Sequence, residues 1–517
     1  MTGEESAVDF SDDCDVLVVG SGAGALTGAY TAAREGLRVI VVEATEHVGG
    51  MSAYSGGGMW FPCNPVLCRA GDDDTIEDAL AYFRAVVGER TPAALQEAFV
   101  RGGAPLVDYL ETDPAFEFQV LPWPDYYGAA PHARPKGRHI VPAPVPAERL
   151  GDMRQLLRSP LATDRGPDDP PEQLGGGQAL IGRFLLALAQ RPNATLLVRA
   201  RCDKLIRIGG RVVGASINSP EGERRIRVHR GVLIAAGGFE RNDALRERFG
   251  VPGSSRDSMA PPGNCGAALE AAIDIGADVD LMSEAWWAPG ITHPDGSSTF
   301  SLWLTGGIFV DDAGDRFTNE SAPYDRAARD VLREIAEARI TLPYWLIHDS
   351  RAGVTPPVMV TSIPLDDPAQ FQEAGLWHAA DTLAELAVII GVPADRLTAT
   401  VKRFNEFAAS GADEDYGRGQ EPFDRSVPGS RNPLRPIDRP PFRAAAFGLS
   451  DLGTKGGLRT DAHARVLDSQ GQVIPGLYAA GNSMAAVSGT TYPGGGNPVG
   501  ASMVFSYRAA LDMVQPG

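Results

Sequence analysis

The sequence predicts an α/β protein that contains a parallel sheet, and three segments near the N-terminus support this prediction. Residues 15–20 form a mostly apolar run that ends in glycine, which is typical of a strand buried on both faces of a parallel sheet. Residues 25–35 are rich in alanine and predict a helix, which Gly36 ends. Residues 38–43 predict a second buried strand. Together these segments predict a βαβ unit.

Further strands of the same sheet are expected later in the chain. Residues 195–201, 212–217 and 225–229 predict short strands. The apolar run 232–238 predicts a strand that returns to the sheet, and residues 473–481 form another glycine-rich, strand-like segment. The chain then ends in a helical pattern, so its C-terminus is expected to complete the first domain.

A stretch of different composition interrupts these strands. It is rich in proline and carries amphipathic patterns at 381–390 and 393–409, which predict helices. A chain of 517 residues is also too long for one simple core. We therefore expect residues 1–284 and 449–517 to form one domain in two segments, and residues 285–448 to form an inserted α+β domain that binds the substrate.

The charge of the chain argues against polyanionic partners. Lys and Arg number 47 and Asp and Glu number 66, which gives a formal net charge of −19. A protein of this sign repels phosphate backbones and anionic membrane surfaces. We therefore do not expect nucleic acid as a partner.

The cysteines and the N-terminus indicate a reduced, cytoplasmic compartment. The five cysteines show no CxxC or Cys/His ligand pattern, so we expect no metal site. Residues 1–13 are acidic and lack the features of a secretory signal, and no stretch approaches about 18 apolar residues. No obligate membrane insertion is expected, while peripheral membrane association stays open.

A glycine motif after the first strand predicts a bound dinucleotide. Gly20-Ser-Gly22-Ala-Gly24-Ala25 fits the GxGxxG/A pattern, in which glycines permit a tight turn and let backbone amides approach a pyrophosphate. A helix N-terminus then faces the phosphates. Glu43 closes the next strand at the spacing of a carboxylate that accepts the ribose hydroxyls. The unit is therefore expected to be a Rossmann-type domain.

Two later glycine motifs favour FAD over NAD. Residues 49–58, Gly-Gly-Met-Ser-Ala-Tyr-Ser-Gly-Gly-Gly, resemble the loop that runs beside the pyrophosphate and isoalloxazine in the fumarate-reductase-like flavoproteins. Residues 478–482 resemble the late motif of that superfamily, which meets the ribityl chain and the pyrophosphate. His47 does not lie in the pattern of the covalent members, so FAD is expected to bind without a covalent bond.

This resemblance implies a set of cofactor contacts spread along the whole chain. They fall on Gly20, Gly22, Ala23, Gly24, Glu43, Ala44, Gly49, Gly50, Met51, Ser52, Ser55, Gly56, Gly57, Cys202, Ala236, Gly237, Gly481, Asn482, Asn497, Pro498 and Val499.

Over nearly its whole length the sequence is also similar to the 3-ketosteroid 1-dehydrogenases. The motifs that carry this similarity are residues 49–58, Trp-Pro-Asp-Tyr-Tyr at 123–127, Arg-Phe-Thr-Asn-Glu-Ser-Ala-Pro-Tyr at 316–324, Gly-Thr-Lys-Gly-Gly at 453–457 and Tyr-Pro-Gly-Gly-Gly-Asn-Pro at 492–498. The resemblance places the four catalytic positions of that family on Tyr126, Tyr324, Tyr492 and Gly496.

The resemblance implies a 1,2-desaturation of 3-ketosteroids, such as conversion of 4-androstene-3,17-dione to the 1,4-diene in steroid degradation. Tyr492 and the Gly496 N–H would polarise the C3 carbonyl as an oxyanion hole. Tyr324 would remove the C2 proton with help from Tyr126, and flavin N5 would accept the C1 hydride. Tyr127 stays an alternative to Tyr126.

The substrate is expected in an apolar cleft between the domains. Trp286, Trp287 and Trp303 are expected in the core or the pocket wall, and Lys455 would contact the flavin or fix its loop. An external electron acceptor such as a quinone is required. Three other functions stay open: a ketosteroid 4,5-dehydrogenase, a fumarate-reductase-like enzyme that would need an Arg/His clamp, and a non-catalytic flavin-binding electron carrier.

Overall fold

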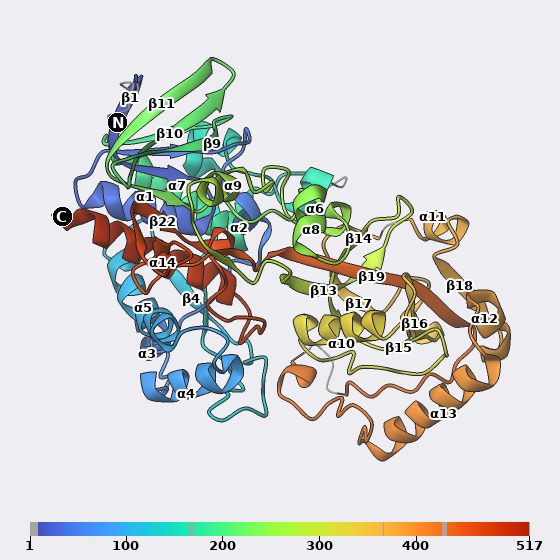
Figure 1. The fold of residues 1–517 in the computed structure, drawn as a ribbon. Helices are drawn as coiled ribbons and strands as arrows, with labels where there is room; N and C mark the ends of the chain where they lie inside the picture. The colour runs from blue at the N-terminus through green and yellow to red at the C-terminus, as the bar shows by residue number, and fades with distance from the viewer. Residues whose placement is uncertain (1–8, 166–168, 366, 427–431, 516–517) are drawn as a thin grey trace.

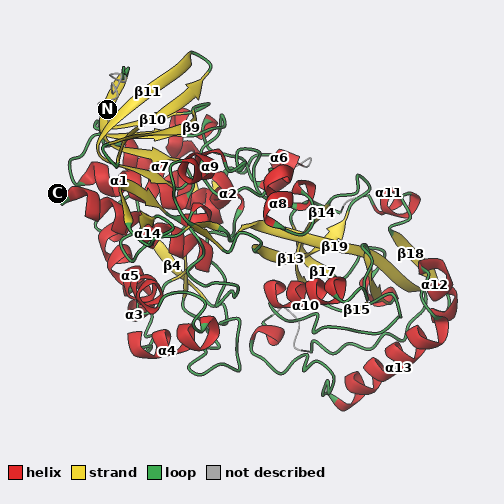
Figure 2. Ribbon diagram, in the orientation of Figure 1, coloured by secondary structure: helices red, strands yellow, loops and turns green. Residues whose placement is uncertain are grey.

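Two large β-sheets organise the chain. The computed structural model describes residues 9–165, 169–365, 367–426 and 432–515. The sheets lie at opposite ends of an elongated molecule, and both termini lie at the end that holds the first sheet (Figure 1). Figure 2 shows helices packed around each sheet.

The first sheet has eight strands in the order β21-β22-β11-β1-β2-β8, with β10 beside β11 and β9 beside β10. The pairings along β22-β11-β1-β2-β8 are parallel. The strands are β1 (Asp12–Val19), β2 (Val39–Val42), β8 (Ala194–Leu197), β9 (Arg201–Ile208), β10 (Arg211–Ser219), β11 (Gly222–Ile234), β21 (Arg465–Leu467) and β22 (Val473–Ala479). This confirms the predicted α/β fold and βαβ unit, with α1 (Ala23–Arg34) between β1 and β2.

One strand prediction was wrong. Residues 225–229 and 232–238 were expected to form two strands, but they share the single strand β11, which ends at Ile234. The Arg230-Gly231 step does not break the strand because β1 pairs with both halves, from Asp12 opposite Ile226 to Val19 opposite Ile234.

Helix α14 (Asn497–Val514) packs along α1, so the C-terminal segment completes the first sheet's helical layer. A Cβ atom on Gly24 would lie 2.7 Å from the carbonyl oxygen of Ser502, which explains why a glycine stands at this contact. The other helices of this part are α2 (Gly50–Tyr54), α3 (Pro65–Arg69), α4 (Ile76–Val87), α5 (Ala93–Glu111), α6 (Leu161–Arg165), α7 (Gly176–Ala189), α8 (Asp243–Phe249) and α9 (Ala267–Asp274).

The structure also contains three small sheets in its described residues. They are β3 (Met59–Trp60) with β5 (His139–Pro142) and β4 (Phe118–Leu121), β6 (Val145–Pro146) with β7 (Gln173–Leu174), and β12 (Val279–Asp280) with β20 (Gly457–Leu458).

The second large sheet has seven antiparallel strands in the order β15-β16-β19-β13-β14-β17, with β18 beside β19. The strands are β13 (Ala285–Thr292), β14 (Ser298–Leu304), β15 (Ile308–Val310), β16 (Tyr344–His348), β17 (Val358–Thr361), β18 (Trp377–Ala380) and β19 (Phe442–Thr454). The helices of this part are α10 (Tyr324–Ala336), α11 (Pro368–Glu373), α12 (Leu383–Ile390) and α13 (Ala394–Ser410), and the last two match the predicted helices.

The long strand β19 connects the two parts of the molecule, as Figure 1 shows. It continues to Thr454, so the predicted boundary at residue 448 lies inside a strand. The division into domains stays a prediction. In the described part of the chain, no helix combines the length and the apolar character that crossing a bilayer requires.

Candidate active site

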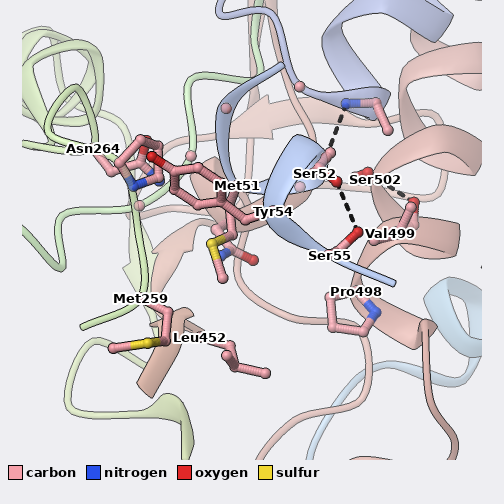
Figure 3. Close-up of a pocket in the computed structure, with 18 of the residues that line it drawn as sticks. Met51, Ser52, Tyr54, Ser55, Met259, Asn264, Leu452, Pro498, Val499 and Ser502 are labelled. Carbon is pink, nitrogen blue, oxygen red and sulfur yellow. Dashed lines mark hydrogen bonds between the residues drawn. The ribbon is translucent and has the colours of Figure 1, made fainter. Parts of the chain in front are cut away.

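A cavity of about 920 Å³ lies between the two parts of the molecule. Its first end is lined by the loop before α1, the end of β2, helix α2 and the residues after β11. Figure 3 shows Ser52 of α2 and Ser55, the residue after α2, close to Pro498 and Val499 of α14, with Met259 and Leu452 at another wall. The opposite end is lined mainly by aromatic and aliphatic side chains.

The loop between β1 and α1 is shaped for close approach to phosphate groups. Gly20 has a φ of +105°, and a Cβ atom there would lie 2.3 Å from the carbonyl oxygen of Ala235. The N-cap residue of α1, Gly22, has no side chain that could cap the helix, and the Ala23 N–H donates to Ser52 Oγ at 3.0 Å. A helix N-terminus of this kind binds anionic groups.

Glu43 lies at the end of β2 and its carboxylate is fixed in place. It accepts hydrogen bonds from Ser21 Oγ at 2.5 Å, the Thr45 N–H at 2.8 Å and Thr45 Oγ1 at 2.7 Å. Ser21 and Thr45 also line the cavity but were not predicted. Ser21 lies inside the glycine motif, and its hydroxyl group was the only feature of the sequence that could have indicated a role at this site.

The structure brings nearly all predicted cofactor positions together. Gly49 and Asn497 are the exceptions, because neither lines the cavity. The Gly49 N–H instead donates to Ser21 Oγ at 3.0 Å. Asn497 is completely buried at the start of α14, and its amide atoms have no hydrogen-bond partner among the described residues.

Three tyrosines meet at the apolar end of the cavity. The rings of Tyr126 and Tyr492 have centroids 5.1 Å apart, those of Tyr324 and Tyr492 5.6 Å, and those of Tyr126 and Tyr324 5.8 Å. All three contacts are edge to face, which aromatic rings prefer. Trp286 packs against Tyr492, and Phe300 packs against Tyr324.

Local structure holds each tyrosine in this cluster. Tyr324 is the first residue of α10, directly after Pro323. Tyr492 lies in the loop before α14, and the next residue, Pro493, accepts hydrogen bonds at its carbonyl from the Tyr126 N–H at 3.0 Å and from Tyr82 Oη at 2.5 Å. The loop that carries Tyr492 therefore fixes Tyr126 as well.

Burial makes these phenols harder to ionise. It raises the pKa of Tyr492 to about 12 and that of Tyr324 and Tyr126 well above the usual value. At neutral pH each hydroxyl is therefore a hydrogen-bond donor, and a tyrosine that removes a proton needs help to ionise.

Gly496 supplies a backbone donor beside Tyr492. Its φ is +80°, and a Cβ atom there would lie 2.1 Å from the carbonyl oxygen of Gly58, so only glycine fits. Its N–H donates to Tyr492 Oη at 3.4 Å, and Gly496 is the N-cap residue of the 18-residue helix α14. A hydroxyl and an amide N–H thus lie next to each other in the lining of the cavity, and both are groups that can donate to a carbonyl oxygen.

Tyr127 and Lys455 lie near the tyrosine cluster but outside the lining of the cavity. Tyr127 does not line it, and the Tyr127 N–H donates to Tyr82 Oη at 3.3 Å. Lys455 is completely buried behind the tyrosines and does not line the cavity either. Of the two adjacent tyrosines, Tyr126 therefore faces the cavity.

The apolar wall was only partly predicted. Trp286 and Trp303 line the cavity, while Trp287 is buried in the core. Leu121, Phe300, Leu302, Met259 and Leu452 also line it and were not predicted. Phe300 and Leu302 are two apart on β14, a spacing that places them on one face, but the sequence does not tell which face meets a cavity. The described residues contain no cluster suited to a metal ion.

Comparison with known proteins places the chain among flavoenzymes. The FAD binding domain family matches residues 15–499. A 3-oxosteroid 1-dehydrogenase of Mycobacterium tuberculosis is 37% identical, with 96% of this chain and 97% of that protein covered. A 4-oxocyclohexanecarboxylate 2-dehydrogenase of Sinomonas cyclohexanicum is also 37% identical, with 96% and 92% covered.

A solved structure gives the same result at the level of the fold. The 3-ketosteroid Δ1-dehydrogenase from Sterolibacterium denitrificans, in complex with 1,4-androstadiene-3,17-dione, superimposes with a TM-score of 0.89. It is 32% identical, and the match covers 98% of this chain and 100% of that one.

Proposed function

We infer the reaction from the family to which this chain belongs, that of the FAD-dependent 3-oxosteroid 1-dehydrogenases. We propose that it removes hydrogen from the 1,2 bond of a 3-ketosteroid, for example 4-androstene-3,17-dione, and forms the 1,4-diene. The observation that carries this proposal is the cluster of Tyr126, Tyr324 and Tyr492 beside the Gly496 N–H at the apolar end of the cavity.

The residues at the other end of the cavity fit FAD. The close-packed Gly20 turn and the N-terminus of α1 suit the pyrophosphate, and the Glu43 carboxylate suits the ribose hydroxyls. When bound, FAD supplies the acceptor for the hydride. Non-covalent binding stays a prediction.

Tyr492 and Gly496 would bind the C3 carbonyl oxygen of the substrate. Both groups donate hydrogen bonds, and Tyr492 stays protonated because burial raises its pKa to about 12. Two donors in a site shielded from water stabilise the negative charge that forms on this oxygen when C2 loses a proton. The C2 proton thereby becomes more acidic.

Tyr324 would take the C2 proton as the general base. Its ring packs edge to face against that of Tyr492, with centroids 5.6 Å apart, and both residues line the cavity. Because burial raises its pKa, Tyr324 needs help to ionise, and Tyr126 is the neighbouring phenol that would give this help by hydrogen bonding. The proton taken from C2 would thus replace one that Tyr324 has released to solvent. The ketone loses one proton and one hydride in total.

A second candidate function uses the same chemistry on a smaller ketone. The dehydrogenase from Sinomonas is as similar in sequence as the steroid enzyme from Mycobacterium. Its named substrate carries a carboxylate, which needs a cationic partner. Among the described residues, the charged side chains that line the cavity are Glu43, Arg158 and Arg201, and Arg158 contacts Thr45 at the nucleotide end. An apolar steroid therefore fits the tyrosine end better.

The test is an anaerobic titration of the purified yellow protein. We expect 4-androstene-3,17-dione to bleach the flavin absorbance and yield the 1,4-diene, identified by mass spectrometry. Bleaching by 4-oxocyclohexanecarboxylate alone would instead establish the smaller ketone as substrate. Bleaching by neither ketone would refute the proposed reaction. An external acceptor such as a quinone, a cytoplasmic location and a role in steroid degradation remain part of the proposal.

A further inference from the structure

Lys455 is a charged side chain buried directly behind the tyrosine cluster. It follows the last residue of β19, and none of its surface is exposed. Its Nζ donates to the carbonyl oxygens of Thr490 at 3.0 Å and Thr491 at 3.1 Å. It also lies 3.4 Å from Asp325 Oδ1 and 4.4 Å from the ring centroid of Trp286.

These contacts join the two segments that carry Tyr324 and Tyr492. Asp325 is the residue after Tyr324 in the first turn of α10, and Thr491 is the residue before Tyr492. The two segments are far apart in the sequence, and Lys455 contacts both. The Trp286 ring beneath the ammonium group packs against Tyr492 at 4.9 Å between centroids.

The charge of Lys455 also offsets that of Asp325. Burial raises the pKa of Tyr492, and the negative charge of Asp325 adds to this effect. Burial is the largest cause that raises the pKa of Tyr126, and Tyr492 is the next. The Asp325 carboxylate raises this pKa further. Lys455 and Arg329, which lies 3.1 Å from Asp325 Oδ2, both neutralise this carboxylate.

We propose that Lys455 is a positioning residue for the dehydrogenation, which holds the segments of Tyr324 and Tyr492 together and neutralises Asp325 beside them. This inference rests on the proposed function, because it assigns a role in proton removal by the tyrosines. Lys455 itself does not touch the cavity, so its effect passes through the residues it holds.

The charge on Lys455 is sensitive to pH in the alkaline range. Burial lowers its pKa to about 8, and the charged groups that face it are Asp325 and Arg329 of α10 and Glu284 of the turn before β13. Below this pH the ammonium group is charged. Above it, Asp325 loses one of its two cationic partners.

The test compares the Lys455→Met variant with the wild type and with two matched variants. Arg329→Met removes the other cationic partner of Asp325 but keeps the contacts with Thr490 and Thr491. Lys402→Met removes an exposed lysine of α13. For each variant we would measure FAD content, thermal unfolding, kcat and KM from pH 6 to 10.

We expect Lys455→Met to keep its FAD and its KM while kcat falls about 10- to 100-fold, the size of a lost positioning or acid–base contribution. Arg329→Met should lose less, and Lys402→Met should match the wild type. The double variant Asp325→Asn/Lys455→Met should regain part of the lost kcat, because the carboxylate that lost one of its two cationic partners is gone. Wild-type kcat should fall as pH rises through about 8, a fall that Lys455→Met lacks.

Three outcomes would overturn the inference. Folded Lys455→Met with wild-type kcat and pH profile would do so, as would a double variant no better than the single one. If Lys455→Met does not fold, a wild-type kcat without any fall above pH 8 decides against the role. A wild type that oxidises neither ketone is different, because it refutes the proposed reaction itself.

Discussion

At the scale of single residues, the site depends on three phenols that burial makes harder to ionise. The structure places Tyr126, Tyr324 and Tyr492 within about 6 Å of one another between ring centroids, whereas Tyr127 lies outside the cavity. Adjacent tyrosines thus have different surroundings, and Tyr127 is a natural control for each catalytic variant.

Replacing Tyr492 with Phe removes one of the two donors to the substrate carbonyl. We expect kcat/KM to fall about 100- to 1000-fold, as for loss of an oxyanion-hole donor, while FAD content stays at the wild-type level. Steady-state kinetics with 4-androstene-3,17-dione measures this change. Tyr127→Phe should keep wild-type kinetics, and equal losses in both variants would contradict the assignment of Tyr492.

Replacing Tyr324 with Phe removes the proposed base. We expect kcat to fall about 100- to 10,000-fold, with KM nearly unchanged because the carbonyl donors remain. Stopped-flow measurement of flavin bleaching reports this step directly. A Tyr324→Phe variant that bleaches at the wild-type rate would show that another group removes the proton.

At the scale of elements, the helix contact between α1 and α14 shapes the nucleotide end of the cavity. In the Gly24→Ala variant, the added methyl would lie 2.7 Å from Ser502 O, and backbone atoms cannot move aside without shifting a helix. We expect a loss of about 1–3 kcal/mol in the free energy of unfolding and a lower FAD content.

Gly175→Ala is the matched control for this helix contact. A Cβ atom there meets no atom within 4 Å, and its φ is −124°. Thermal unfolding and the ratio of flavin to protein absorbance compare the two variants. A Gly24→Ala protein with the stability and FAD content of the wild type would contradict this prediction. It would show that α14 can shift to accommodate the added methyl group at little cost in free energy.

At the scale of the whole molecule, buried neutral histidines make the fold sensitive to acid. Burial lowers the pKa of His139 to about 3 and that of His348 to about 4, whereas the unfolded imidazole titrates near about 6.5. Between these values the unfolded chain binds more protons than the folded one. Stability therefore falls as pH is lowered from about 6.5 toward 4, by about 1.4 kcal/mol for each unit of pKa difference.

The measurement is the slope of the unfolding free energy against pH. His348→Gln should flatten this slope between pH 6.5 and 4, even if its stability at neutral pH is lower. His463→Gln, a change at an exposed position, is the control and should keep the wild-type slope. An unchanged slope in His348→Gln would mean that this histidine does not contribute.

Local patterns were enough to predict the first half of the site. The βαβ unit, the glycine turn at Gly20–Gly24 and the carboxylate at the end of β2 depend on short-range periodicity and on backbone conformations that glycine permits. The same reasoning failed for β11. The local sequence around Gly231 suggested a turn, but pairing with β1 keeps the strand continuous through this glycine.

By itself, the sequence determined the α/β class, the FAD motifs and, through resemblance, which tyrosines to consider. The tertiary structure decided which of the two adjacent tyrosines faces the cavity, that Gly49 and Asn497 lie outside its lining, and that Lys455 joins the segments of Tyr324 and Tyr492. The reason is physical: motif residues are close in the chain, whereas these contacts join separate segments, such as Lys455 and Asp325 at 130 positions apart, and depend on how those segments pack.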